Sequence, residues 1–174
     1  MSNADEIIRL LDLKPLPQEG GFYRETFRSP LVLPSGSMGG EYEGERNAST
    51  AIYFLLTPDE HSAMHLLPTD EVFHFYLGDP VEMLRLYPDG SADVSRMGTD
   101  LAAGERPQLV VPGGVWQGCR IADGGRFALL GCTVAPGFDF RDFHVATAAE
   151  IDELTGRYPQ HTSLIKELAP KSPT

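Results

Sequence analysis

Residues 61 to 78 read His61-Ser-Ala-Met-His65-Leu-Leu-Pro-Thr-Asp-Glu71-Val-Phe-His74-Phe-Tyr-Leu-Gly78. Two apolar runs rich in strand-forming residues make up this stretch, and the turn-forming residues Pro68-Thr69-Asp70 separate them. Three histidines and one carboxylate lie along the two runs. A polar cluster on paired strands predicts a cavity that these side chains line.

Side chains alternate between the two faces of a strand, which rises by roughly 3.3 Å per residue. From Glu71 onward, one face carries Glu71, Phe73, Phe75 and Leu77, and the other carries Val72, His74 and Tyr76. His61 and His65 share a face of the preceding run but lie about 13 Å apart if that strand is regular. They cannot both bind one metal ion through bonds of about 2 Å.

The remaining chain predicts many short strands and few helices. Residues 4–13 have helical spacing and a capping box from Asn3 and Glu6, so a helix ending before Pro15 is expected. Residues 22–28 alternate like a strand. Residues 29–47 predict a long loop near the cavity mouth, which is either a lid or an ordinary surface loop. Further strands are expected at 49–57, 62–67, 71–77, 81–87, 92–97, 108–111, 115–121 and 126–134.

Closely spaced strands without intervening helices indicate an antiparallel sandwich or barrel. The turns at 88–91 and 122–125 suit hairpins because their glycines tolerate positive φ. Thr147 and Glu150 form a second capping box, and residues 163–168 suit a last short helical turn. We therefore expect an all-β fold with a few short flanking helices. It comprises one domain over 1–174, with a barrel at about 22–141 and C-terminal helices at about 148–168.

Composition narrows the possible functions. The chain has 174 residues, is 41% hydrophobic and carries a formal net charge of -11. This charge argues against nucleic acid as a partner, because phosphate binding depends on clustered lysine and arginine. Cys119 and Cys132 are too few for a disulfide framework, and no apolar stretch suits a signal peptide or a membrane span. A cytoplasmic protein with two free thiols and no membrane partner is expected.

The motifs resemble a known family. His65, Glu71 and Gly78 are spaced like the first motif of the cupin superfamily, and the segment 112–117 approaches the second. Four segments are similar in sequence to the branch of RmlC-like cupins called cupin 5, which has no assigned general function: 49–56, 70–79, 111–116 and 136–140. This resemblance covers nearly the whole chain. It implies a double-stranded β-helix, the cupin jelly-roll barrel, and a homodimer in which an N-terminal strand extends the partner's sheet.

The chain departs from the metal-binding pattern of cupins. A metal cupin generally offers two histidines and a glutamate from the first motif and a histidine from the second. The aligned positions here include Leu67 and Gln117, and imidazole is the ligand that iron, nickel and zinc favour. No metal or other cofactor is therefore expected. A weak site formed by His65, Glu71 and Gln117 stays open as an alternative, joined by His61 or His74 if a bulge shifts the strand register.

The resemblance implies a small-molecule ligand, with or without catalysis. If the protein is an enzyme, the RmlC type implies metal-independent epimerisation or isomerisation of a carbohydrate-like substrate. His65 is the candidate base, Glu71 orients it, and Tyr53 is the candidate acid. The expected substrate contacts are Phe73, Phe75, Trp116, Gln117 and Arg24. Two alternatives stay open: a non-catalytic binding protein for a small apolar or aromatic metabolite, and a metal-dependent cupin.

Overall fold

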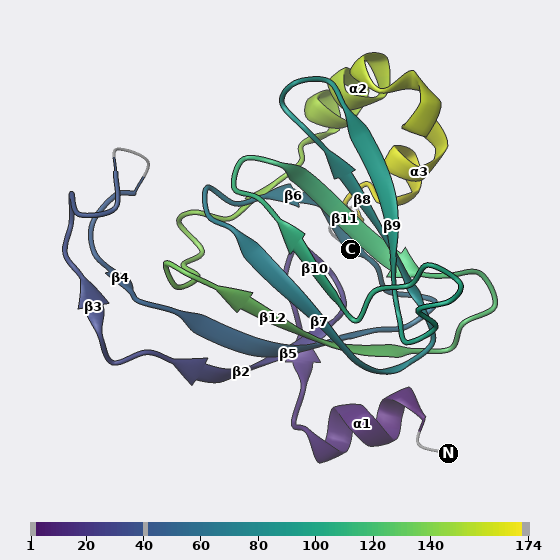
Figure 1. Ribbon diagram of the computed structural model, residues 1–174, viewed down its shortest axis with the longest axis horizontal. Helices are drawn as coiled ribbons and strands as arrows, with labels where there is room; N and C mark the ends of the chain where they lie inside the picture. The colour runs from purple at the N-terminus through teal and green to yellow at the C-terminus, as the bar shows by residue number, and fades with distance from the viewer. Residues whose placement is uncertain (1–2, 40–41, 172–174) are drawn as a thin grey trace.

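Two antiparallel sheets face each other and enclose the interior of the molecule (Figure 1). The computed structural model describes residues 3–39 and 42–171. The first sheet contains β1 (Lys14–Pro15), β2 (Phe22–Arg28), β5 (Thr50–Leu56), β12 (Ala128–Val134), β7 (Glu71–Gly78) and β10 (Gln108–Val111), in that spatial order. The second contains β13 (His144–Val145), β6 (Ser62–Leu66), β11 (Trp116–Ile121), β8 (Val81–Leu86) and β9 (Ala92–Met97). The expected cupin jelly roll is confirmed.

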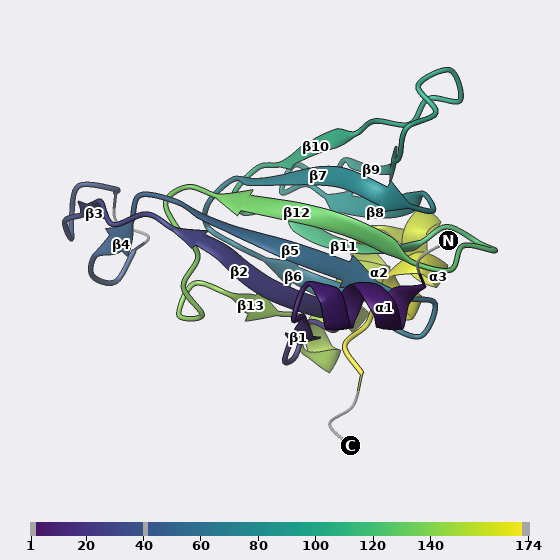
Figure 2. The same ribbon diagram turned by 90° about the horizontal axis from the view of Figure 1, so that it is seen from below.

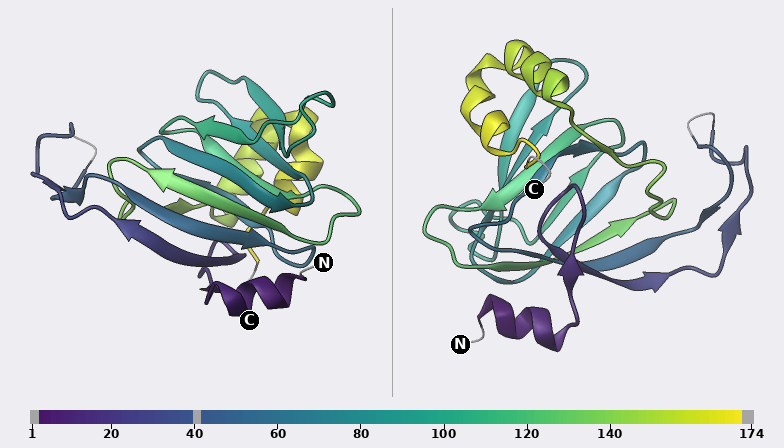
Figure 3. Two further views of the ribbon diagram at one scale, coloured as in Figure 1. Left: turned by 60° about the horizontal axis from the view of Figure 1, so that its bottom comes forward. Right: turned by 180° about the vertical axis from the view of Figure 1, so that it is seen from behind.

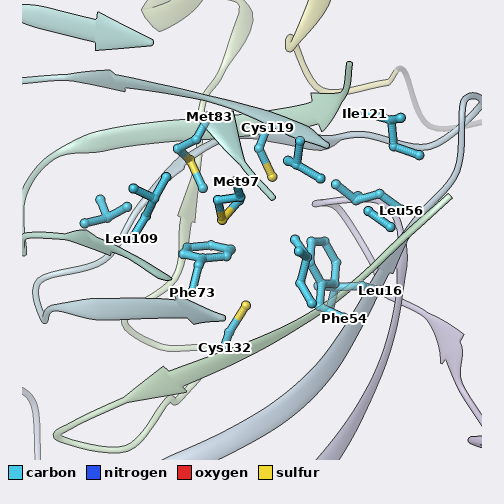
Figure 4. Close-up of a cluster of buried hydrophobic side chains, with 14 of the residues drawn as sticks. Leu16, Phe54, Leu56, Phe73, Met83, Met97, Leu109, Cys119, Ile121 and Cys132 are labelled. Atoms are coloured by element: carbon cyan, nitrogen blue, oxygen red, sulfur yellow. The ribbon is translucent and has the colours of Figure 1, made fainter. Parts of the chain in front are cut away.

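Apolar side chains form three clusters that hold the layers together. The central cluster lies between the sheets and includes Phe54, Phe73 and Met83 (Figure 4). A second packs the outer face of the second sheet against the C-terminal helices. A third packs the outer face of the first sheet against the N-terminal helix (Figure 2). Both sheets are therefore apolar on part of each face.

The helices begin where capping residues place them. Helix α1 (Ala4–Leu10) starts at Asn3, whose side chain accepts a hydrogen bond from the Glu6 backbone. It ends earlier than expected because Asp12 takes a left-handed backbone, with a φ of 49°. The predicted capping box of Thr147 and Glu150 starts α2 (Ala148–Arg157). A short 3-10 turn, Pro159–His161, then leads into α3 (Thr162–Glu167).

One predicted hairpin forms, and two predicted pairings of strands do not. The turn at 88–91 joins β8 to β9 as a hairpin, as expected. The turn at 122–125 does not form a hairpin, because β11 belongs to the second sheet and β12 to the first. The same applies to the turn at 68–70, which carries the chain from β6 in one sheet to β7 in the other. The two runs of the opening stretch are therefore not paired strands but face each other across the interior.

The segment predicted as a long loop contains a small strand pair of its own. Strands β3 (Val32–Leu33) and β4 (Arg46–Asn47) pair with each other and extend away from the two sheets (Figure 3). Residues 40–41 of the predicted loop lie outside the described residues. At its base, Arg46 is buried and binds both carboxylate oxygens of Asp142, at 2.7 and 2.6 Å. This ion pair ties the segment to the chain that follows β12.

No helix within residues 3–39 and 42–171 is long and apolar enough to span a membrane. Beyond Tyr23, the outer edge of β2 has no strand partner in the described part of the chain, because β1 pairs with only its first two residues. An open sheet edge of this kind is where a second chain can pair. The homodimer implied by the resemblance stays a prediction.

Candidate functional site

A cavity of about 530 Å³ opens between the two sheets. Its floor is polar and consists of Glu19, His65 and Glu71. Its walls are mainly apolar and include Tyr23, Ile52, Phe54, Leu67, Val134, Phe138, Phe140 and Phe143. Glu25, Arg28 and Asp139 carry the other charges of the lining. The volume and the mixture of apolar walls with a few polar groups are typical of small-molecule sites.

The floor begins with a histidine whose ring orientation is held by the backbone. Nδ1 of His65 lies 2.7 Å from the carbonyl oxygen of Ala63, so Nδ1 carries the hydrogen that it donates. Nε2 faces Glu71, with 3.9 Å between Nε2 and Oε2. The Phe143 ring tilts against the imidazole with 5.1 Å between centroids. His65 comes from β6 and Glu71 from β7, so the floor joins the two sheets.

Gln117 lies behind the floor and holds Glu71 in place. Its side-chain nitrogen donates to Oε2 of Glu71 at 2.8 Å, and its backbone pairs with that of His65 in the second sheet. Only 1% of Gln117 is exposed. Its carbonyl oxygen Oε1 is buried and accepts no hydrogen bond within residues 3–39 and 42–171. Gln117 is therefore a support for Glu71, whereas the sequence predicts a contact with substrate.

Glu19 reaches the floor from the segment between β1 and β2. Ser62 donates to its Oε1 at 2.6 Å, and its own carbonyl oxygen accepts from the Ala63 backbone at 2.9 Å. The turn that carries Glu19 needs positive φ at Gln18 (68°) and at Gly20 (97°). A Cβ atom on Gly20 would also collide with the carbonyl oxygen of His61. This tightly held turn inserts a carboxylate into the barrel.

Burial and neighbouring charges change the pKa of His65 and of Glu19. Burial alone would lower the pKa of His65, but the negative charges of Glu19 and Glu71 outweigh it and raise this pKa to about 9. Burial also raises the pKa of the Glu19 carboxyl, and the charge of Glu71 adds to this effect. Near neutral pH, His65 is therefore an imidazolium that faces two carboxyl groups.

A titration of His65 followed by imidazole NMR signals is expected to give a pKa of about 9. Replacing Glu71 by glutamine should lower this value, because a positive charge loses its negative neighbour. Since the pKa in the folded protein exceeds the unfolded value, the stability due to His65 is complete below about pH 6.5 and is lost as the pH rises through about 9. A measured pKa at or below 6.5 would contradict the charge network described above.

Four of the predicted substrate contacts and the candidate acid Tyr53 lie away from the cavity. Phe73 is 1% exposed and belongs with Phe75 to the central apolar cluster. Tyr53 points out of the barrel, where its ring meets Tyr76 edge to face and Arg24 lies over it at 5.6 Å. Trp116 lies on the outer face of the second sheet, beside His144. None of these five lines the cavity. For Tyr53, Arg24 and Trp116, the reason is that their strands present alternate residues inward.

The other histidines have partners elsewhere. Nε2 of His61 lies 3.0 Å from the carbonyl oxygen of Ala169, at the C-terminal segment. His74 lies between Thr133 and Gln108 on the first sheet. Neither lines the cavity with His65.

Sequence reasoning missed Glu19 and most of the aromatic wall. Glu19 lies in a segment rich in proline and glycine, and no periodicity marks it. Tyr23 lies on a predicted strand, whose alternation places it on the same face as Glu25. Phe138 and Phe140 belong to a stretch, 136–140, that the cupin resemblance singles out without assigning it a role. These residues come together only through the fold.

The donor set does not fit the metal site of metal-binding cupins. No group of three or more His, Cys, Asp or Glu side chains in the described part of the chain has a geometry suited to a metal ion. Leu67 lines the cavity where the aligned cupins carry a histidine. Gln117 presents its nitrogen, not its oxygen, to Glu71.

Comparisons with known proteins identify the family of the chain. The family described as "Cupin superfamily (DUF985)" matches residues 5–146. The uncharacterized protein YML079W from Saccharomyces cerevisiae is 35% identical over 133 residues, which cover 72% of this chain and 66% of the yeast protein. The chain thus spans just under two thirds of the length of that relative.

Solved structures show the same fold. Protein SO0799 from Shewanella oneidensis is 36% identical, with a TM-score of 0.84, and the match covers 99% of this chain and 100% of that one. A cupin 2 domain-containing protein from Halorhodospira halophila matches 88% of this chain and 86% of its own, with a TM-score of 0.56 and 10% identity. The second likeness concerns the fold alone. The chain belongs to the cupin superfamily, in the family designated DUF985.

Proposed function

We propose that this protein binds a small carbohydrate-like molecule and moves a proton on the carbon next to its carbonyl group, without a metal ion. The observation that supports this proposal is the cluster of Glu19, His65 and Glu71 on the floor of the cavity. Enzymes that remove such a proton need a base for the carbon and a donor for the carbonyl oxygen. The floor places carboxylates and an imidazolium side by side.

The charge of His65 assigns it a different role from the one that the sequence suggests. An imidazolium with a pKa of about 9 is a poor base near neutral pH. It is a suitable donor to the carbonyl oxygen, where negative charge develops as the proton leaves the carbon. Glu19, whose pKa is raised by burial, is the base that takes the proton. The electron pair of the broken C–H bond forms the enolate, whose oxygen His65 stabilises.

The returning proton needs a second donor if the configuration at carbon is to invert. Tyr53, the acid that the sequence suggests, does not line the cavity, so another tyrosine must donate this proton. Tyr23 lines the cavity from β2, across from the second sheet. A proton from Tyr23 to the opposite face of the enolate completes an epimerisation. If the substrate carries a hydroxyl group on the carbon that loses its proton, an isomerisation is completed when Glu19 returns the proton to the former carbonyl carbon and His65 transfers the hydroxyl proton to the former carbonyl oxygen.

Solvent deuterium tests this proposal directly. The wild-type protein, incubated with a panel of keto-sugars in deuterated water, is expected to introduce deuterium at the carbon next to the carbonyl. His65→Gln should reduce the rate by about 10²–10⁴-fold, the usual contribution of one acid or base. NMR of the recovered sugar measures both rates.

A matched variant separates the cavity from general effects. His144 lies on the surface, and its Nε2 contacts Glu150 at 2.7 Å. His144→Gln should therefore exchange at the wild-type rate. Absence of deuterium from every keto-sugar, or an unchanged rate in His65→Gln, would refute the proposed reaction.

The aromatic wall favours a second candidate function. Phe138, Phe140 and Phe143 contact one another at centroid distances of 5.0–6.3 Å along one side of the cavity. Such a wall also suits a protein that holds a small apolar or aromatic metabolite without changing it. Native mass spectrometry of the purified protein distinguishes the two. An organic molecule that is retained and released unchanged supports binding alone.

A further inference from the structure

The charges of the cavity lining divide into two groups. Six lining residues are charged: Glu19, Glu25, Arg28, His65, Glu71 and Asp139. Outside the floor, each carboxylate has its own cation. Arg28 binds both oxygens of Glu25, at 3.0 and 2.8 Å, and Arg141 binds both oxygens of Asp139, at 2.9 and 2.7 Å. These two pairs are electrically neutral.

The floor holds more acidic groups than basic ones. It contains two carboxyl groups, those of Glu19 and Glu71, and one basic group, the imidazole of His65. Gln117 and Ser62 donate hydrogen bonds to the two carboxylates but carry no charge. One acidic group of the floor therefore has no basic partner among the described lining residues. A ligand with a positive group can supply the missing charge, whereas an anionic ligand adds to the imbalance.

Outside the floor, the described lining residues offer an anionic ligand one cation, and that cation is already engaged. Arg28 is the one arginine or lysine among the described residues that line the cavity. Its guanidinium also donates to the Asn47 side chain at 2.9 Å and to the carbonyl oxygen of Phe138 at 3.1 Å. Four hydrogen bonds hold it in place. A phosphate or carboxylate would have to displace these contacts.

The apolar wall is compatible with a cation. Aromatic rings attract ammonium groups through their electron-rich faces, and groups of such rings are a known way of holding organic ammonium ions. Phe138, Phe140, Phe143 and Tyr23 provide these rings beside the acidic groups of the floor. Their ring edges and faces also suit the apolar part of the same ligand.

From this arrangement we infer that the cavity selects ligands that carry an amine, with the ammonium group at Glu19 and the apolar part against Phe138, Phe140 and Phe143. The inference rests on the proposed function only in using the same cavity as the ligand site. It narrows the substrate class from carbohydrate-like molecules to those with an amino group. It also excludes sugar nucleotides and other anions as the preferred ligands.

Three probes of nearly equal size and different charge test this inference: benzylamine, benzyl alcohol and benzoate. Their dissociation constants are measured by NMR, from the shifts of the amide signals of cavity residues. Benzylamine should bind the wild-type protein at least about tenfold more tightly than benzoate, as expected for one charge interaction in a partly buried site. Benzyl alcohol should lie between them.

Charge variants identify the residue responsible. Glu19→Gln keeps the shape and removes the charge, so the ratio of benzoate to benzylamine dissociation constants should fall by about tenfold. Glu153 is exposed on α2, and Glu153→Gln, which removes the same charge there, should leave the ratio unchanged. If Glu19→Gln does not fold, Glu71→Gln removes the other carboxylate of the floor and should reduce the ratio similarly.

Three results would overturn the inference: benzoate binding as tightly as benzylamine, a ratio unchanged in the floor variants, or no shift of cavity signals by any probe. Each is separate from the fate of the proposed reaction, which the deuterium exchange of keto-sugars decides. Deuterium exchange together with a preference for benzoate would support the proposed reaction and refute the preference for amines. A preference for benzylamine without deuterium exchange would support the preference for amines and refute the proposed reaction.

Discussion

Replacing Asp142 by alanine is expected to lower the free energy of unfolding by about 3–5 kcal/mol, the usual cost of leaving one partner of a buried ion pair alone. The side chains of Arg46 and Asp142 are 1% and 9% exposed. Arg46 also donates to the carbonyl oxygens of Glu43 and Glu45, so its guanidinium makes four hydrogen bonds in the folded protein. Without Asp142, that buried charge has no counterion.

An exposed ion pair nearby provides the control. Arg141 and Asp139 form an ion pair whose side chains are 55% and 29% exposed. Arg141→Ala should therefore cost less than about 1 kcal/mol. Urea unfolding followed by circular dichroism measures both variants. Equal losses in Asp142→Ala and Arg141→Ala would show that the buried pair contributes no more than a surface pair.

The Asp142 variant should also change the cavity. Asp142 immediately precedes Phe143, which lies against His65, and Phe140 is two residues before it. Loss of the ion pair frees this segment from the base of the β3–β4 extension. We expect weaker binding of any cavity ligand even at temperatures where Asp142→Ala is fully folded.

Replacing Phe73 by alanine is expected to cost about 3–5 kcal/mol, because a large buried ring leaves a void between the sheets. Phe73 pairs in register with Leu109 on one side and Cys132 on the other, and Figure 4 shows its ring between these side chains and Met97. Only 1% of Phe73 is exposed. The effect is on the fold, although the sequence suggests a contact with substrate.

Phe140 provides the contrast. It lines the cavity and is 55% exposed, so Phe140→Ala should cost less than about 1 kcal/mol while weakening ligand binding. Thermal unfolding and the benzylamine titration separate the two effects. Similar losses of stability in Phe73→Ala and Phe140→Ala would contradict the division between core and wall.

The sequence alone predicted the fold and the centre of the candidate site. Spacing of apolar residues located the strands, and capping residues located the starts of α1 and α2. The spacing of His65, Glu71 and Gly78 indicated the cupin fold. These features follow from local geometry, since strand alternation and helix caps depend on residues a few positions apart.

Which face of β5 points inward could not be predicted. Thr50, Ile52 and Phe54 line the cavity, while Tyr53 and Leu55 face outward and pack with residues of α1. Both faces of this strand carry apolar side chains, because the helix covers the outer one. Apolar and polar residues therefore do not alternate along β5, and the sequence does not show that Tyr53 faces away from the cavity.

The sequence by itself determined the class of fold and the pairing of one imidazole with one acid. Both depend on the spacing of residues along one short stretch. Only the tertiary structure brought Glu19, Tyr23 and the three phenylalanines of the wall to that pair. Glu19 and Tyr23 lie more than forty positions before His65, and the three phenylalanines lie more than sixty positions after Glu71. No local feature of the sequence links them. Their meeting depends on strands that cross between two sheets, and so does the charge that His65 carries.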